Sequence, residues 1–170
     1  MSRSVMTRIR AVYDNTPFPE GQAVGLVVDP VLDRVRPMPL PGSRALHLTA
    51  GLLALAAGFA LDAWALMERR RRTAGEFRLE EPESLVTTGP YAWCRHPMYV
   101  GSWLIHLGVG VIRGSGWVAV TLPVGAIAEH LGALAEERAL HRAFGEEWAD
   151  YRERVPRYAG WPRRRGRATA

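Results

Sequence analysis

The chain has 170 residues, with 22 basic and 17 acidic side chains and a net charge of +5, and every basic residue other than histidine is an arginine. The absence of lysine excludes a Schiff-base lysine, pyridoxal-phosphate chemistry and a lysine-bearing phosphate loop. Cys94 stands alone, which excludes an internal disulfide framework and a multi-cysteine metal site. The length favours a single domain.

Residues 45–67 form the first long apolar segment. As a helix it would extend over roughly 35 Å, enough to cross a hydrocarbon core of about 30 Å. Four consecutive arginines at 69–72 follow it almost directly. This abrupt change from apolar to charged residues favours a membrane span over the core helix of a soluble protein.

Residues 98–112 and 117–134 form two further apolar segments, and the glycine-rich residues 113–116 between them predict a turn. The first of the two is short for a full span and would tilt or lie partly within protein. The fold class is therefore predicted as all-α, an integral membrane helical bundle. We expect about three transmembrane helices, the last two forming a C-terminal helical hairpin.

Arginines concentrate between the first two apolar segments and in the tail that follows residue 134. The positive-inside rule places both regions in the cytoplasm and predicts an integral membrane protein, in the plasma membrane, with a pocket facing the cytoplasm. Residues 1–44 are predicted as an interfacial or re-entrant segment, because their apolar stretch at 23–28 is too short to span. Residues 45–161 would form the membrane domain and 162–170 a basic tail near anionic lipid headgroups.

Polar and aromatic residues gather in two motifs, each beside an apolar segment. Residues 85–101 read Leu-Val-x-x-Gly-x-Tyr-x-x-x-Arg-His-Pro-x-Tyr-x-Gly, and a proline in the first turn would open a helix whose N-terminus suits an anionic ligand group. Residues 136–156 read Glu-Glu-x-x-Leu-x-x-x-Phe-Gly-x-x-Trp-x-x-Tyr-x-x-x-Val-Pro. Taken alone, the first motif is equally compatible with an interfacial aromatic belt, and the second with a salt-bridged juxtamembrane helix.

The two motifs together resemble those of the isoprenylcysteine carboxyl methyltransferases and their relatives, the phospholipid N-methyltransferases. The resemblance extends over about residues 70–161. It implies a membrane methyltransferase that uses S-adenosylmethionine without a Rossmann domain. The acceptor would be an oxygen or nitrogen atom of a lipophilic or amphiphilic small molecule or lipid.

The resemblance also implies a set of site residues. The predicted cofactor-binding residues are Glu83, Ser84, Leu85, Val86, Tyr91, His96, Pro97, Met98 and Tyr99, and Glu76 aligns with a further contact. The predicted catalytic residues are Glu136, Glu137 and Arg95, and no metal site is expected. The side-chain chemistry fits: Tyr91 and Tyr99 offer ring faces, Glu136 or Glu137 acceptors for an ammonium group, and Arg95 or His96 donors for a carboxylate.

One position departs from the resemblance. Prenylcysteine-processing members carry a substrate-contacting arginine one turn before the first acid, and this chain has Gly132 there. A carboxylate acceptor would lose its charge partner unless Arg138, Arg154 or Arg157 replaced it, which argues against prenylcysteine.

Two other functions stay open: an NADPH-dependent, steroid-reductase-like membrane enzyme, and a non-catalytic membrane adaptor. Expected partners are a lipophilic substrate and membrane lipids. Nucleic acid is not expected, since no aromatic–basic surface motif accompanies the charge. Because related chains usually have more N-terminal spans, a homo-oligomer or a re-entrant segment would complete the bundle.

Overall fold

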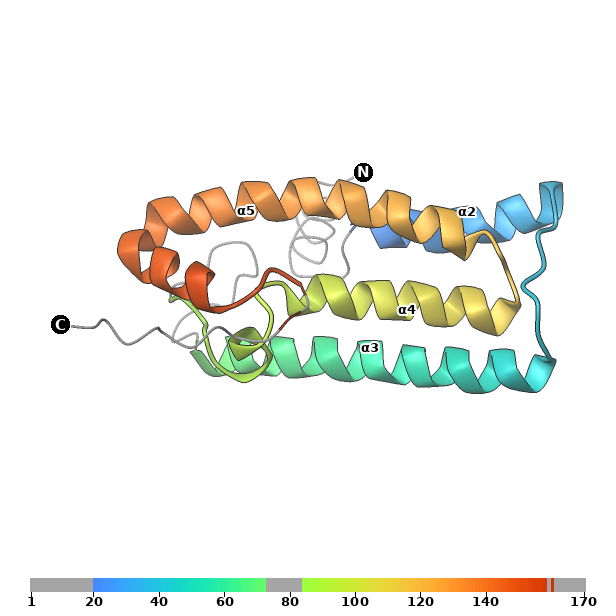
Figure 1. Ribbon diagram of the computed structural model, residues 1–170, viewed down its shortest axis with the longest axis horizontal. Coiled ribbons are helices and arrows are strands. Elements are labelled where there is room, and N and C mark those ends of the chain that lie inside the picture. Colours follow the sequence, from blue (N-terminus) through green and yellow to red (C-terminus); the bar gives the residue numbers. More distant parts are fainter. Residues whose placement is uncertain (1–19, 73–83, 159, 161–170) are drawn as a thin grey trace, which may run out of the picture.

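The computed structural model describes residues 20–72, 84–158 and 160, and it is built from helices (Figure 1). In chain order these are α2 (Glu20–Val35), α3 (Arg44–Arg72), the short 3-10 helix η1 (Gly89–Ala92), α4 (Pro97–Arg113) and α5 (Val118–Arg154). Extended pairing in the described part is limited to an isolated bridge between Pro39 and Ser115. The all-α prediction is confirmed, and the three apolar segments fall on α3, α4 and α5.

Helices α3 and α4 run antiparallel and touch through their glycines (Figure 1). A Cβ atom on Gly58 would lie 2.6 Å from the carbonyl oxygen of Gly101, and one on Gly108 would lie 2.8 Å from that of Gly51. No side chain fits at such distances, so the two backbones are in direct contact. Small residues play the same part in pairs of membrane helices, where close packing replaces the hydrophobic effect.

A single methyl group tests this contact. A Cβ on Gly101 would collide with the carboxylate of Asp62, whereas a Cβ on the exposed Gly132 would meet only the Tyr99 hydroxyl, at 3.7 Å. We expect Gly101→Ala to lower the free energy of unfolding by about 1–3 kcal/mol. Gly132→Ala should raise it by up to about 1 kcal/mol through helix propensity. Thermal unfolding in detergent checks both signs, and a shift in the same direction for the two variants would contradict the packing.

The predicted turn between the last two apolar segments is confirmed. Gly114 ends α4 in the left-handed region (φ +69°), which a side chain would disfavour. Its N–H donates to the carbonyl oxygen of Val111 at 2.9 Å, and the N–H of Ser115 donates to that of Gly110 at 3.0 Å. These bonds close α4 and return the chain into α5.

Helix α5 reverses near its C-terminal end. Gly145 has non-helical angles (φ +52°, ψ −122°), as expected of a glycine helix stop. The residues after it fold back across one end of the bundle, where Figure 1 shows the red segment returning toward the start of α4. This reversal is what brings the second motif against the first.

Apolar side chains lie on the outside of the bundle. Exposed fractions reach 67% at Leu53 on α3 and 64% at Ile127 on α5. Helices α3 and α5 are each long and apolar enough to cross a membrane. Because water would disfavour such surfaces and lipid would not, the structure indicates a membrane protein. Helix α4 has 17 residues and rises only about 25 Å, so the total of three spans stays a prediction.

Polar side chains are instead buried where α2 packs along α5 and α4. The carboxylate of Glu129 accepts hydrogen bonds from the Gln22 backbone N–H (2.9 Å), the Gln22 side-chain amide (3.3 Å) and the Trp103 indole N–H. The His106 ring contacts the Gln22 amide oxygen and, at 3.0 Å, the Asp29 carboxylate. This network fixes α2 to the bundle.

Whether residues 1–44 are interfacial or re-entrant stays a prediction, and residues 1–19 lie outside the described part.

Candidate active site

The segment that leads into α4 is held against the end of α3. Gly89 begins η1 with φ +60°, and a Cβ there would lie 3.0 Å from the Cγ atom of Glu68. The buried Glu68 carboxylate also accepts a hydrogen bond from the Thr88 hydroxyl. Because the loop lies this close to α3, Tyr91 in η1 is buried.

The end of α5 covers this loop from the other side. Trp148, Tyr151 and Val155 form a buried cluster against which Leu85 and Leu140 pack. The Tyr151 hydroxyl donates to the carbonyl oxygen of Tyr91 at 2.7 Å. The two sequence motifs therefore meet in space.

Backbone hydrogen bonds fasten the residues after α5 to the start of α4. The N–H of Arg95 donates to the carbonyl oxygen of Pro156 at 3.0 Å, and the N–H of His96 donates to that of Arg157 at 3.1 Å. These N–H groups precede a helix and have no intrahelical acceptor, so the chain end satisfies them. The same bonds hold Arg157 beside the paired acids of α5.

Glu137 is the centre of a buried ion cluster. Its carboxylate accepts two bonds from the Arg157 guanidinium, both 2.8 Å. It also lies 3.2 Å from Nη2 of Arg95 and 3.2 Å from Nε2 of His96. The Glu137 side chain is 7% exposed. A carboxylate shared by three cationic groups acts as their common anchor.

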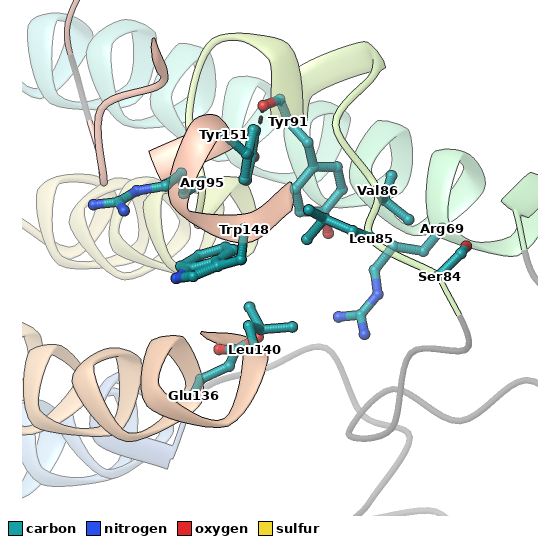
Figure 2. Close-up of a pocket in the computed structure, with 10 residues that line it drawn as sticks. All are labelled: Arg69, Ser84, Leu85, Val86, Tyr91, Arg95, Glu136, Leu140, Trp148 and Tyr151. Atoms are coloured by element: carbon teal, nitrogen blue, oxygen red, sulfur yellow. Dashed lines mark hydrogen bonds between the residues drawn. The ribbon is translucent and has the colours of Figure 1, made fainter. Parts of the chain in front are cut away.

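Glu136 is placed differently from its neighbour. Its side chain is 43% exposed, and its Oε2 lies 3.5 Å from Nδ1 of His96. It faces a small pocket, part of which is open to solvent. Figure 2 shows the pocket walls, which are Arg69, Ser84, Leu85, Val86, Tyr91, Arg95, Glu136, Leu140, Trp148 and Tyr151.

Charge and burial set the protonation states around the pocket. Burial favours the neutral ring of His96, but its hydrogen bonds to the carboxylates of Glu136 and Glu137 together outweigh this and raise the pKa of His96. Burial raises the pKa of the Tyr91 hydroxyl to about 12 and that of the Cys94 thiol to about 11. Cys94 is thus a neutral thiol at physiological pH and a poor nucleophile.

The raised pKa of His96 gives a pH dependence of stability. A pKa higher in the folded than in the unfolded state contributes stability that is fully present below the ordinary value of 6.5 and is lost as the pH rises through the folded value. The stability advantage of the wild type over His96→Gln should therefore shrink as the pH rises above 6.5. Unfolding temperatures in detergent measure it, with the exposed His141→Gln as control. A constant advantage would contradict the assignment.

Comparison with known proteins shows the family of the chain. The phospholipid methyltransferase family profile matches residues 46–147, more than half of the chain. The chain belongs to the phospholipid methyltransferase family. The matched residues include nearly all of α3, η1, α4 and most of α5. They therefore include Arg69 of α3 and Glu136 of α5, which both line the pocket.

Individual relatives of this methyltransferase family member match over a shorter stretch. The mouse protein-S-isoprenylcysteine O-methyltransferase is 38% identical over 77 residues, 45% of this chain and 27% of the mouse protein. The cobalt-zinc-cadmium resistance protein CzcN of Cupriavidus metallidurans is 38% identical over 76 residues, 44% of this chain and 35% of that protein. The matched part thus covers about a third or less of these relatives. No solved structure matches the chain.

The structure brings most of the predicted site residues together. Ser84, Leu85, Val86 and Tyr91 line the pocket with Arg95 and Glu136. His96 borders it through Glu136, while Glu137 lies behind it in the ion cluster. Pro97, Met98 and Tyr99 form the first turn of α4 and do not line it, although the Tyr99 ring packs 5.3 Å from that of His96. Glu83 and Glu76 lie outside the described residues. The roles of all these residues stay predictions.

Sequence reasoning missed four pocket residues. Trp148, Tyr151 and Leu140 stand in the second motif, but its charged face drew attention to a solvated helix rather than to a cover over the first motif. Arg69 was interpreted only as part of a basic cytoplasmic flank. The sequence signal that could have revealed this cover is Gly145, because a chain reversal at that glycine places Trp148 and Tyr151 back over the bundle.

Proposed function

We propose that this family member transfers a methyl group from S-adenosylmethionine to an oxygen or nitrogen atom of a lipophilic or amphiphilic acceptor. The observation that carries the proposal is a pocket at the end of an apolar bundle, in which the carboxylate of Glu136 faces a wall made by both motifs. The polar methyl donor would reach such a pocket from water, and a lipophilic acceptor would reach it from the lipid bilayer.

The residues of the pocket suit this cofactor. Leu85, Tyr91 and Trp148 present apolar and aromatic surface of the kind that holds a nucleobase. Ser84 and Glu136 add a hydroxyl and a carboxylate, and a carboxylate is the natural acceptor for an ammonium group. The pocket therefore has residues suited to the adenine end and to the amino-acid end of S-adenosylmethionine.

When bound, S-adenosylmethionine supplies an electrophilic methyl group on a sulfonium centre. The chain's own residues have to align the acceptor with this group and exclude water, which accounts for much of the rate gain in such displacements. No covalent enzyme nucleophile is needed, in keeping with the raised pKa of Cys94. When the acceptor carries a proton, the exposed carboxylate of Glu136, next to His96, is the group that accepts it.

The orientation follows from charge. The pocket lies at the end of α3 that carries Arg69 and the arginines after it. We therefore infer that this end faces the cytoplasm and that the protein resides in the plasma membrane. The mouse relative's name describes O-methylation of protein S-isoprenylcysteine, but Gly132 leaves this chain without the arginine that such an acceptor would use.

The test begins with binding. Calorimetric titration of the purified protein in detergent should show binding of S-adenosylhomocysteine and none of NADPH. Product mass spectrometry after incubation with labelled cofactor and a lipid extract of the host should then reveal a methylated lipid or small molecule. Binding of NADPH alone would overturn the proposal in favour of a reductase, and cofactor binding without turnover on any extract would favour an adaptor.

A further inference from the structure

Tyr99 lies outside the pocket but near the Glu136 carboxylate. It does not line the pocket, yet its ring centre lies 5.3 Å from that of His96, and Nδ1 of His96 lies 3.5 Å from Oε2 of Glu136. Within the described residues the Tyr99 hydroxyl has no hydrogen-bond partner. A phenol that approaches Glu136 from outside the pocket is therefore placed to hold a molecule other than the cofactor.

Helix α5 leaves open space beside this hydroxyl. Gly132 lies one helical turn before Glu136, so both residues are on the same face of α5. Among the described residues, a Cβ atom on the exposed Gly132 would meet only the Tyr99 hydroxyl, at 3.7 Å. The neighbouring Leu131 is 62% exposed, on the apolar surface that we assign to lipid. The Tyr99 hydroxyl can thus be reached from the lipid side of the bundle.

Other seams of the bundle are closed by backbone contacts. Glycines hold the backbones of α3 and α4 in direct contact, and a Cβ atom on Gly21 would lie 2.6 Å from the carbonyl oxygen of Gly125, so α2 and α5 touch as well. At Gly132, by contrast, α5 faces a side chain of α4. A lipophilic molecule could therefore enter between α4 and α5 near Tyr99 without separating two backbones.

Aromatic rings lie around this position. The ring centre of Tyr158 lies 4.8 Å from that of Trp103 and 6.0 Å from that of His96. Tyr99, Trp103 and Tyr158 are each only partly buried. Ring faces bind apolar groups and also cations. The rings thus offer a packing surface to a lipophilic acceptor, including one with a cationic head.

The charge that faces Tyr99 is negative. Among the described residues, the charged groups that act on its hydroxyl are the carboxylates of Glu136 and Glu129. The cationic ring of His96 is already shared between Glu136 and Glu137. An acceptor that brought a carboxylate of its own would be repelled here, whereas a hydroxyl or an amine would not. A tyrosine hydroxyl can donate to such a group or accept from it.

Resting on the proposed function, we propose that Tyr99 belongs to a binding site for the acceptor and not for the cofactor. Its hydroxyl holds the reacting group, which is a hydroxyl or an amine and not a carboxylate, next to Glu136. The acceptor enters from lipid beside Gly132. This role differs from the cofactor contact that the family resemblance implies for Tyr99.

Removing one hydroxyl separates the acceptor from the cofactor. Tyr99→Phe should raise the amount of host lipid extract needed for half-maximal transfer from labelled S-adenosylmethionine by roughly 2- to 10-fold, the range for one neutral hydrogen bond. Binding of S-adenosylhomocysteine, measured by calorimetry in detergent, should stay within about twofold of the wild type.

Filling the open space tests the route of entry. Gly132→Leu should place an aliphatic group beside the Tyr99 hydroxyl and lower the transfer rate by roughly 10-fold or more, as a misfitting group in a binding site does. Binding of S-adenosylhomocysteine should not change. Ala119→Leu adds the same side chain at an exposed position near the start of α5 and is the matched control, expected to change neither quantity.

The product reports the chemical class of the acceptor. Mild alkali releases labelled methanol from a methyl ester, whereas a methyl ether and a methylamine keep the label. We expect the product formed from the lipid extract to keep its label. Release of labelled methanol would identify a carboxylate acceptor and overturn the inference.

The remaining outcomes distinguish the acceptor site from the proposed function. Weaker binding of S-adenosylhomocysteine to Tyr99→Phe, with an unchanged requirement for extract, would return Tyr99 to the cofactor, and no change in either would remove it from the site. Full activity of Gly132→Leu would contradict the route of entry. If the wild type fails to bind S-adenosylhomocysteine or to transfer label, the proposed function itself fails.

Discussion

Replacing Glu136 with alanine is expected to reduce methyl transfer by more than about 100-fold, the usual contribution of a positioned acid or base, and to leave the protein folded in detergent. Its side chain lines the pocket and is 43% exposed, with its Oε2 atom 3.5 Å from Nδ1 of His96. Removing it takes an acceptor away from the site and little packing from the core. Initial rates with labelled cofactor, together with the unfolding temperature, measure the two effects separately.

Two variants sharpen this result. Glu136→Gln keeps the size of the side chain and one acceptor oxygen, so a loss there as large as in Glu136→Ala would point to the negative charge of the carboxylate. Glu146→Ala removes an exposed carboxylate just beyond the Gly145 reversal and should leave the rate unchanged. Normal activity of Glu136→Ala would show that the transfer site lies elsewhere.

The helical elements could be predicted because their signals are local. Residues 45–67 are apolar at most positions and contain no proline, and Gly114 is the residue type that ends a helix in the left-handed region. Each of these predictions needed only a short window of sequence. The structure confirmed the helices and the turn for that reason, whereas the reversal at Gly145 was not predicted.

The polar interior could not be predicted in the same way. Gln22 lies 107 residues from its partner Glu129, and Asp29 lies 77 residues from His106. Residues 20–35 contain Asp29 and Pro30, which on their own argue against a buried helix. Their burial depends on partners in α4 and α5, and no local pattern reports it.

The pocket is an intermediate case. The two motifs suggested a shared site, but the distinction between adjacent acids depends on which way each faces on α5. Glu137 points to Arg157, which follows the end of that helix, and Glu136 points to the pocket. Glu136 and Glu137 are adjacent in the sequence and look equivalent there. Their surroundings differ only because residues 155–157 return to the start of α4 and bring Arg157 beside Glu137.

This separation leads to the largest expected effect on stability. Glu137→Ala would remove the anchor of Arg95, Arg157 and His96 and leave their charges without a common partner in a buried cluster. Breaking a buried ion pair from one side costs about 3–5 kcal/mol, because the remaining charge stays desolvated. We therefore expect a clear loss of unfolding free energy in detergent for Glu137→Ala, far greater than for Glu136→Ala.

The comparison with Glu136 decides the roles of the two acids. Glu137→Gln retains one acceptor oxygen for Arg157 and should recover part of the lost stability, as an anchor role requires. The exposed Glu147→Ala should have an effect within about 0.5 kcal/mol, as surface changes usually do. If Glu137→Ala were as stable as the wild type and only inactive, the anchor assignment would be wrong. Glu137 would then belong with Glu136 among the groups that act on the reacting molecules.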